Sequence, residues 1–247
     1  MNNIQRHGRH EIGQHQRSFR IVDLCTGSGC IALLLHALLA PHIDRLSILG
    51  VDLSPAAIAL AKKNLAHNVQ QRLLSNRAAT EVSFQRGNVL PIDSSGLPSA
   101  REVLGNYQGL PSDREPECDV LISNPPYISP ESFRNGTTSR SVRVFEPKLA
   151  LVPPPRDSVI GPGLDRQEDL FYYHIILLSL QVRTKLLVLE CGDRSQATRV
   201  AAIVKTLSSG YRLNALSIEI WSSSGTFISD ETPPENGPCA VVVTAFQ

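Results

Sequence analysis

Short apolar runs alternate with helical patterns along most of the chain, and few folds can accommodate that order. The run FRIVDL ends at Asp23 and precedes a glycine turn and a helical pattern from Cys30 to Ala40. The run LSILGVDLS leads to Ser54 and Pro55, which are typical of a helix N-cap and a first helical residue. Strands that alternate with helices form a mostly parallel sheet covered on both faces. We therefore expect an α/β, doubly wound fold.

The predicted sheet has seven strands, and its last strand is antiparallel. YRLNALSIEI and CAVVVTAF have strand patterns with no helix between them, so we expect a hairpin that places an antiparallel strand at one edge. The other five strand patterns, in chain order, are FRIVDL, LSILGVDLS, EVSFQ, CDVLIS and TKLLVLE.

Two stretches interrupt the alternation. Residues 91–117 are rich in Ser, Pro and Gly, and we expect them to form a surface insertion. Residues 130–165 come soon after the fourth strand pattern, so they should lie beside the carboxyl edge of the sheet. Long loops at such positions are more often functional than accidental. We expect this second stretch to border a binding site.

Composition and charge describe an ordinary globular protein. With 247 residues, 42% hydrophobic and 19% charged residues and a net charge of +1, the chain fits one large α/β domain or two small ones. Proteins that bind long nucleic acids usually carry a basic excess, which is absent here, so nucleic acid is not an expected partner. No apolar run reaches the ~20 residues of a membrane span. The cysteines have no metal-ligand spacing, so neither a membrane anchor nor a metal site is expected.

The start of the chain bears on location. The first twenty residues contain four arginines and one acidic residue, a composition similar to that of a mitochondrial transit peptide and equally to that of a disordered or truncated leader. The five cysteines are an odd number, which argues for reduced thiols inside a cell. We expect a leader over residues 1–19, one domain over residues 20–247, and an intracellular location, mitochondrial or cytoplasmic.

A glycine turn, DLCTGSGCIA, connects the first strand pattern to the first helical pattern. Gly27 and Gly29 let the backbone turn tightly and approach a ligand closely, at the sheet edge where open α/β folds bind their ligands. Asp52 ends the second strand pattern, where its carboxylate can accept hydrogen bonds from ribose hydroxyls. Gly27, Gly29 and Ala32 also satisfy the relaxed dinucleotide pattern. NAD and S-adenosylmethionine therefore both fit, and a turn without a ligand is the remaining alternative.

The fourth strand pattern ends in Asn124, Pro125, Pro126 and Tyr127, a stiff polar corner. A residue before proline stays extended, and the two prolines keep their carbonyl acceptors while lacking N–H groups. The Asn124 side-chain oxygen and the Pro125 carbonyl can accept the two hydrogens of a planar NH2 group, while Tyr127 packs on its face. This arrangement directs the nitrogen lone pair at one point, so methyl transfer from a sulfonium becomes a matter of positioning and electrostatics. Hydride transfer has no use for such a clamp, so the pairing favours S-adenosylmethionine.

Three segments in this order, DLCTGSGCIALLL, VDLSPAAIALAKKN and VLISNPPYIS, resemble the class I S-adenosylmethionine-dependent methyltransferases that act on planar nitrogens, which have a Rossmann-like fold. Asn-Pro-Pro-Tyr alone also suits adenine methylation in DNA or RNA. VRVFEPKLALV, the later Gly-Leu-Asp at 163–165 and LLVLECG are similar to the protein-(glutamine-N5) methyltransferases that modify peptide-chain release factors. The resemblance covers about residues 20–247. It implies methylation of the glutamine in the Gly-Gly-Gln motif of a release factor.

The resemblance also implies roles for individual residues. The catalytic pocket would consist of Asn124, Pro125, Pro126 and Tyr127, with Asn124 contacting both cofactor and substrate amide. We further infer that Glu146 stabilises the loop that closes over the site, with an ordinary ion pair as the alternative. The implied cofactor-binding residues are Asp23, Cys25, Thr26, Gly27, Ser28, Gly29, Asp52, Leu53, Asn88, Val89 and Asn124.

Some features depart from the family pattern. The family usually has a helical domain ahead of the catalytic one, and only about twenty residues precede IVDL here. Asn88 stands where the family usually has an acid, and three prolines partly replace a glycine-rich stretch after ALV. Two alternatives therefore stay open: an adenine-N6 methyltransferase acting on DNA or RNA, and a catalytically weak cofactor-binding relative without the substrate-docking domain.

Overall fold

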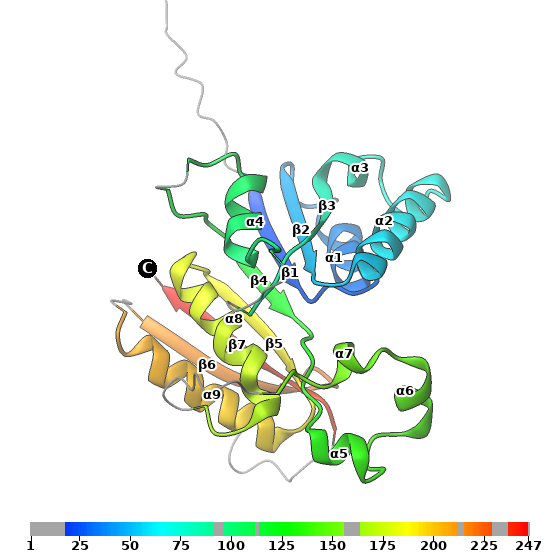
Figure 1. Ribbon diagram of the computed structural model, residues 1–247. Helices are drawn as coiled ribbons and strands as arrows, with labels where there is room; N and C mark the ends of the chain where they lie inside the picture. Colours follow the sequence, from blue (N-terminus) through cyan, green and yellow to red (C-terminus); the bar gives the residue numbers. More distant parts are fainter. Residues whose placement is uncertain are drawn as a thin grey trace, which may run out of the picture.

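One seven-stranded sheet organises the chain in the computed structural model, which describes residues 18–90, 96–111, 114–155, 164–211, 215–228 and 237–246 (Figure 1). The strand order is β3-β2-β1-β4-β5-β7-β6, as expected for a doubly wound α/β fold. The strands are β1 (Phe19–Leu24), β2 (Leu46–Asp52), β3 (Val82–Arg86), β4 (Val120–Ser123), β5 (Leu186–Cys191), β6 (Ala215–Ser222) and β7 (Cys239–Phe246).

The last strand is antiparallel, as predicted, but it does not lie at the edge of the sheet. β7 pairs antiparallel with both β5 and β6, so it is inserted between them and β6 forms the edge. The sequence predicts the hairpin but not which of its two strands pairs with β5. β7 contributes the buried side chains of Val241 and Val243, whereas β6 has an exposed Trp221 and only its last residue, Ser222, is buried. The more apolar strand, β7, takes the inner position, where it has a neighbouring strand on each side.

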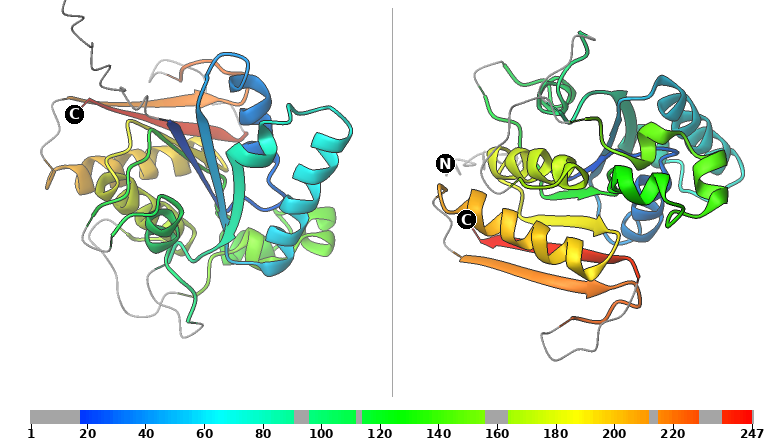
Figure 2. Two further views of the ribbon diagram at one scale, coloured as in Figure 1. Left: turned by 90° about the horizontal axis from the view of Figure 1, so that it is seen from above. Right: turned by 60° about the horizontal axis from the view of Figure 1, so that its bottom comes forward.

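Helices cover the two faces of the sheet (Figure 2). On one face, α1 (Cys30–Leu39), α2 (Pro55–Gln70) and α3 (Ala78–Glu81) enclose a core that includes Ile48 and Phe84. On the other face, a larger core contains side chains from three further helices and from β5 and β7. These helices are α4 (Ala100–Tyr107), α8 (Leu170–Gln181) and α9 (Arg194–Ser208).

The stretch over residues 91–117 is not only a surface insertion, as the sequence suggested. It contains α4, whose Val103 and Leu104 are buried in the larger core. The helix begins at a capping box in which Ser99 and Glu102 satisfy each other's backbone N–H groups. The apolar face of this short helix consists only of Ala100, Val103 and Leu104, and the polar residues around them obscure it in the sequence.

The stretch after β4 is partly helical and projects from the sheet as a lobe (Figure 1). This lobe contains α5 (Pro130–Arg134), α6 (Arg140–Phe145) and α7 (Lys148–Leu151), and the chain returns to α8 through the 3-10 turn η1 (Gln167–Asp169). The predicted leader lies outside the described residues, apart from its last two positions, and β1 begins at Phe19, one residue before the predicted boundary. In the part of the chain that the structure describes, no helix has the length and apolar character to cross a bilayer.

Candidate active site

The glycine turn leads from the end of β1 into α1, and both of its glycines are left-handed, Gly27 with φ 56° and Gly29 with φ 80°. The Thr26 N–H donates to the Val51 carbonyl at 3.1 Å and holds the turn against β2. Gly29 is required for space as well as for conformation, because a Cβ there would lie 2.7 Å from Cζ of Phe84. At its two glycines the turn therefore presents backbone without side chains at the carboxyl edge of the sheet, as the sequence predicts.

Asp52 ends β2 and joins two turns. Its Oδ2 accepts the Gly27 N–H at 2.9 Å, and its Oδ1 accepts the Ser54 N–H at 2.8 Å. The carboxylate thus orders the glycine turn and the start of α2 together. Each oxygen keeps lone pairs for a further donor, so the expected role toward a ribose is compatible with this structural one.

Asp23, at the carboxyl end of β1, is fully buried beneath the turn. Thr26 Oγ1 donates to its Oδ2 at 2.5 Å and the Ala32 backbone N–H also stabilises the carboxylate, whereas Oδ1 makes no hydrogen bond of good geometry with a described residue. Burial raises the pKa of this carboxyl group to about 7. A buried acceptor without a well-placed donor is rare in folded proteins and needs an explanation, such as a ligand that supplies the donor.

The remaining predicted cofactor residues of the two turns are Cys25, Ser28 and Leu53. Cys25 adopts φ 57°, which is uncommon for a residue with a side chain, and burial raises the pKa of its thiol. This thiol is therefore no nucleophile at neutral pH. Ser28 and Leu53 are half-buried, and the Ser28 carbonyl accepts a hydrogen bond from Asn64 Nδ2 at 2.9 Å.

Asn88 and Val89 follow β3 and begin the connection to α4. Asn88 is buried; its Oδ1 accepts the Leu90 N–H at 3.0 Å and its carbonyl accepts the Ala100 N–H at 2.8 Å. Val89 is half-buried against the larger core. Both residues have fixed structural roles, and their contact with a cofactor stays a prediction.

Asn124 reaches the same edge of the sheet as the glycine turn. β1 and β4 are parallel neighbours in which Leu24 pairs with Ser123, and Ser123 Oγ donates to the Leu24 carbonyl at 2.8 Å. Asn124 is exposed, whereas Pro125 and Pro126 are buried. No hydrogen bond joins the Asn124 side chain to another described residue. The structure therefore brings the two predicted motifs together and leaves the amide of Asn124 free for a ligand.

Tyr127 is half-buried against the carboxyl end of β5. Its hydroxyl donates to Glu190 Oε1 at 3.3 Å, and burial, with the nearby Glu190 carboxylate, raises the pKa of the phenol to about 12. A Cβ on Gly192 would lie 3.1 Å from Cε2 of the Tyr127 ring. The sequence analysis missed Glu190 and Gly192 as site residues, although LLVLECG ends at the same edge of the sheet.

Glu146, which we expected to stabilise a closing loop or to form an ion pair, is the exposed C-cap of α6. It makes no ion pair with a described residue, so the structure gives no support to the ion-pair alternative. Its carboxylate contributes to the raised pKa of Tyr127, which places it within electrostatic range of the pocket. Its role in loop closure stays a prediction.

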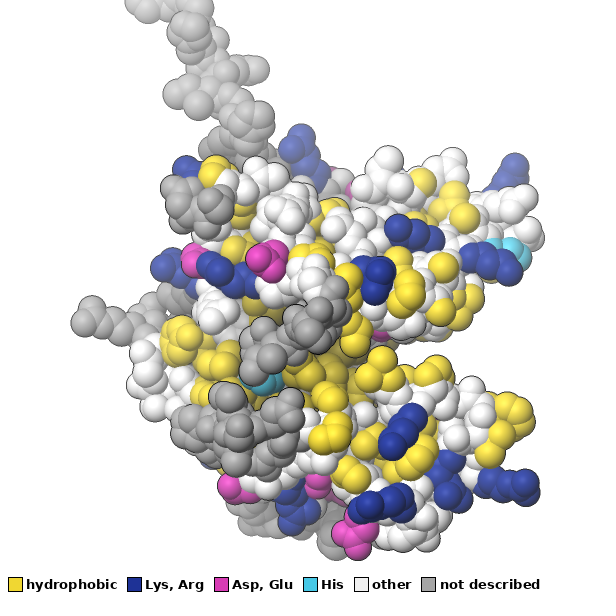
Figure 3. All heavy atoms as spheres, in the orientation of Figure 1, with side chains coloured by type: hydrophobic (Ala, Val, Ile, Leu, Met, Phe, Trp, Pro, Cys, Tyr) yellow, Lys and Arg dark blue, Asp and Glu magenta, His cyan; other side chains and the backbone are white. Residues whose placement is uncertain are grey.

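The surface is hollowed between the part that carries α1 and α2 and the part that carries α5, α6 and α7, and hydrophobic side chains line this hollow (Figure 3).

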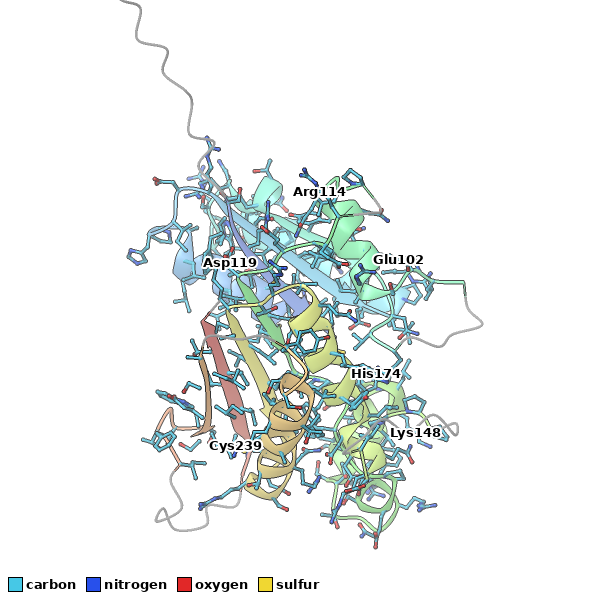
Figure 4. The ribbon with its side chains drawn as sticks, turned by 90° about the vertical axis from the view of Figure 1, so that its left-hand side faces the viewer. Glu102, Arg114, Asp119, Lys148, His174 and Cys239 are labelled. Atoms are coloured by element: carbon cyan, nitrogen blue, oxygen red, sulfur yellow. The ribbon has the colours of Figure 1, made fainter. Side chains whose placement is uncertain are left out.

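The two edges of the sheet can be told apart in Figure 4: Asp119 precedes β4 at the amino edge, whereas Cys239 begins β7 on the carboxyl side. A cavity of about 510 Å³ lies near the amino edge, where Ser179, Thr184 and Val204 line it. The cavity is remote from the residues described above. Within the described ranges, no cluster of three or more His, Cys, Asp or Glu side chains could hold a metal ion.

Comparisons with known proteins give relatives for somewhat more than half of the chain, although no protein-family model matches it. The probable MRF1 mitochondrial N(5)-glutamine methyltransferase mtq1 of Schizosaccharomyces pombe is 36% identical over 137 residues, which are 55% of this chain and 36% of that protein. The release factor glutamine methyltransferase of Nitratidesulfovibrio vulgaris is 37% identical over 54% of this chain and 34% of its own length. The mitochondrial MRF1 N(5)-glutamine methyltransferase MTQ1 of Saccharomyces cerevisiae is 31% identical over 57% and 35%, respectively. The matched part spans only about a third of these relatives.

Among solved structures, the hMettl16 catalytic domain in complex with MAT2A 3'UTR hairpin 1 aligns with a TM-score of 0.50 and 18% identity, over 93% of this chain and 64% of that chain. At this identity the likeness concerns the fold alone. The architecture is a Rossmann-like α/β fold, with the seven-stranded sheet and the inserted antiparallel strand.

Proposed function

We propose that this chain, a relative of the release factor glutamine methyltransferases, transfers a methyl group from S-adenosylmethionine to the side-chain amide nitrogen N5 of the glutamine in the Gly-Gly-Gln motif of a peptide-chain release factor. Two findings support this function: the similarity to enzymes of that name and the meeting of the glycine turn and Asn-Pro-Pro-Tyr at one sheet edge. The matched part covers about a third of those enzymes, so activity, substrate and partner remain proposals for this chain.

The observation that carries the proposal is the state of Asn124. Its amide is exposed and has no hydrogen bond to a described residue, while the two prolines after it are buried and fix the backbone. An exposed, unpaired carboxamide on a rigid backbone, beside a ligand-binding turn, suits recognition of a group that both donates and accepts. The glutamine side chain of a protein substrate is such a group.

The residues around the turn fit S-adenosylmethionine. This cofactor carries an ammonium group, a ribose and a sulfonium, and it would supply an electrophilic methyl group. Oδ1 of Asp23, which makes no hydrogen bond of good geometry with a described residue, would gain the ammonium as a donor, and Asp52 would accept the ribose hydroxyls with its remaining lone pairs. Gly27 and Gly29 leave room for close approach.

The chain itself would align the nitrogen. Asn124 Oδ1 and the Pro125 carbonyl would each accept one hydrogen of the substrate NH2, and the Tyr127 ring would pack on the amide plane. The bound cofactor would supply the methyl group and leave as the thioether, and the substrate nitrogen would then lose one proton to solvent. With its pKa raised to about 12, Tyr127 does not act as the base at neutral pH, so its role is to position the amide.

The lobe beside the pocket offers a surface for a protein substrate. Val144, Phe145 and Leu149 are large hydrophobic residues that are exposed on α6 and α7. Exposed apolar clusters of this kind mark interaction sites. The two fungal relatives are named mitochondrial, which agrees with one interpretation of the arginine-rich start, a segment outside the described residues.

The test is to incubate the purified chain with methyl-labelled S-adenosylmethionine and, in separate reactions, with a release factor, DNA and RNA. We expect label on the factor, at the glutamine of Gly-Gly-Gln by peptide mass spectrometry. Label on adenine would favour the adenine-N6 alternative. Cofactor binding in calorimetry with no label on any substrate would favour the catalytically weak alternative.

An amide truncation tests the residue that carries the argument. Asn124→Ala should lower methyl transfer by about 100-fold, the scale of losing oriented binding of a reacting group. Asn106→Ala, at an exposed position on α4, is the matched control and should leave the rate unchanged. Equal rates for the two variants would remove the basis of the proposal.

A further inference from the structure

The backbone of the Asn-Pro-Pro-Tyr corner depends on donors from elsewhere in the chain. Pro125 and Pro126 have no N–H groups, so at these positions the corner offers only carbonyl acceptors. Directly after Tyr127, the Ile128 N–H donates to the Leu151 carbonyl at 2.9 Å. The Tyr127 carbonyl accepts from the side chain of Gln196, whose Nε2 lies 3.2 Å away. A side chain of α9 thus anchors the corner.

Gln196 is buried, and its carboxamide bonds to three groups. Besides the Tyr127 carbonyl, Nε2 donates to Asp169 Oδ1 at 3.3 Å, and Oε1 accepts the Gly192 N–H at 2.9 Å. One planar amide therefore connects the corner, the β5–α9 turn and the start of α8. Only a carboxamide has both donors and an acceptor in this arrangement.

The orientation of Gln196 is in turn fixed by charge. Asp169 is buried and forms a two-point ion pair with Arg199, whose Nε lies 2.7 Å from Oδ2 and whose guanidinium NH2 group lies 3.0 Å from Oδ1. The Asp169 carboxylate can only accept, so it faces the donor end of Gln196. That directs the second N–H of Nε2 toward the Tyr127 carbonyl and not away from it.

The side chain of Tyr127 is held by the neighbouring strand. Its hydroxyl donates to Glu190, and the Glu190 carbonyl accepts from the Tyr172 hydroxyl at 2.7 Å. Gly192 leaves the space in which the Tyr127 ring lies. Main chain and side chain of Tyr127 are thus fixed from β5, α8 and α9, all outside the two predicted motifs.

We propose that Gln196 is a positioning residue for methyl transfer, because it holds the Tyr127 carbonyl and thereby sets where the pocket presents the substrate amide; Asp169 and Arg199 orient it. This inference rests on the proposed function. Its consequence is specific: loss of the Gln196 donor should displace the corner while leaving the glycine turn, and therefore the cofactor site, unchanged.

The test uses near-isosteric changes at Gln196 in the full chain. Gln196→Met removes all three hydrogen bonds at similar volume, and Gln196→Glu removes both donated bonds and places a second carboxylate against Asp169. For both, we expect kcat on a release factor to fall about tenfold or more, with an unchanged dissociation constant for S-adenosylhomocysteine. Hydrogen exchange followed by mass spectrometry should rise in the peptide that contains residues 124–130 and stay constant in the peptide that contains residues 25–35.

A double variant separates positioning from stability. Asp169→Asn combined with Gln196→Glu removes the repulsion between two adjacent carboxylates, because an amide at position 169 can donate to a carboxylate at position 196, and Glu168 remains 3.7 Å from Arg199. The unfolding midpoint should therefore recover relative to Gln196→Glu alone. The Tyr127 carbonyl still lacks its donor, so kcat should stay low. Recovery of kcat together with stability would mean that Gln196 acts only through the fold, and it would overturn the proposal. Unchanged kcat and exchange in both single variants would overturn it as well.

Two controls complete the design. Gln108→Met removes a carboxamide that donates to the Glu117 carbonyl at 2.6 Å and accepts its N–H at 3.1 Å, far from the site, and should change neither kcat nor exchange in residues 124–130. If the wild-type chain methylates no release factor, the proposed function fails. The exchange data still decide whether Gln196 holds the corner.

Discussion

At the scale of single residues, Asp23 is the group whose environment departs most from that of an ordinary surface carboxylate. Burial raises its pKa from 3.8 to about 7, so the folded protein holds a proton more tightly than the unfolded chain does. Below about pH 4 both states are protonated and the group has no effect on stability. As the pH rises toward 7, the unfolded chain ionises freely while the folded state does not, so stability is lost over this window.

The variant Asp23→Asn removes this loss while still accepting the Thr26 hydroxyl. The difference in unfolding free energy between this variant and the wild type should increase in favour of the variant by about 1.4 kcal/mol per pH unit between about pH 4 and 7. Above that range the difference should stay constant. Urea denaturation at several pH values, without cofactor, measures the gap. The same variant should bind S-adenosylmethionine more weakly. A constant gap across the range would contradict the raised pKa.

Gly29 is constrained by both conformation and space. Gly29→Ala should destabilise the protein by about 2–4 kcal/mol, because φ 80° strains an L-residue and the new Cβ meets Phe84. Gly105→Ala is the matched control in α4, where a Cβ meets no atom within 4 Å. That change should stabilise the protein by about 0.5–1 kcal/mol through helix propensity. Chemical denaturation of both variants checks the opposite signs.

What the sequence predicted at this scale was the place of each motif, not the partners of its side chains. Gly27, Asp52 and Asn124 were expected at one sheet edge because parallel strands end together, and the structure places them there. Glu190 and Gln196 could not be found in this way. Their importance depends on contacts with Tyr127 across more than sixty positions of the chain, which no local pattern encodes.

At the scale of elements, the lobe formed by α5, α6 and α7 is distinguished by what it exposes. Phe145 is 84% exposed, and Val144 and Leu149 lie nearby in the chain, so among the described residues this apolar surface has no covering partner. The sequence predicted a functional loop here from its length and position, but not its helices. α6 and α7 have six and four residues, too few to generate a recognisable helical period.

Replacing the most exposed of these side chains tests whether the lobe contacts a protein substrate. Phe145→Ser should lower kcat/KM for an intact release factor about tenfold, the scale of an aromatic anchor at an interface. It should leave kcat/KM for a short Gly-Gly-Gln peptide unchanged. Phe227→Ser, at another exposed aromatic residue near β6, is the control. Equal losses on factor and peptide would place the effect in the pocket instead.

At the scale of the whole molecule, the cysteines show how the fold distributes chemical reactivity. Cys30 is exposed, whereas Cys118, Cys191 and Cys239 are buried. Burial raises the pKa of Cys118 to about 12 and that of Cys239 to about 11, so their thiols stay protonated near neutral pH. Cys191 and Cys239 are directly opposite each other on β5 and β7 and share this environment.

Brief alkylation with iodoacetamide, followed by peptide mass spectrometry, should therefore label Cys30 in the native protein and spare Cys118, Cys191 and Cys239, because the thiolate is the reactive species. In urea all five cysteines should react. Rapid labelling of the three buried thiols under native conditions would mean that the sheet opens locally near β5 and β7.

The position of β7 has a consequence for biosynthesis. β6 pairs only with β7 among the described strands, and β7 comes last of the seven in the chain. A nascent polypeptide that has extended only to β6 cannot attach that strand to the growing sheet, and it exposes the apolar edge of β5 until residues 239–246 emerge from the ribosome. An early stop codon before Cys239 should thus yield a product that chaperones and proteases recognise. Folding of this chain then depends on ribosomes reaching the codons of its final strand.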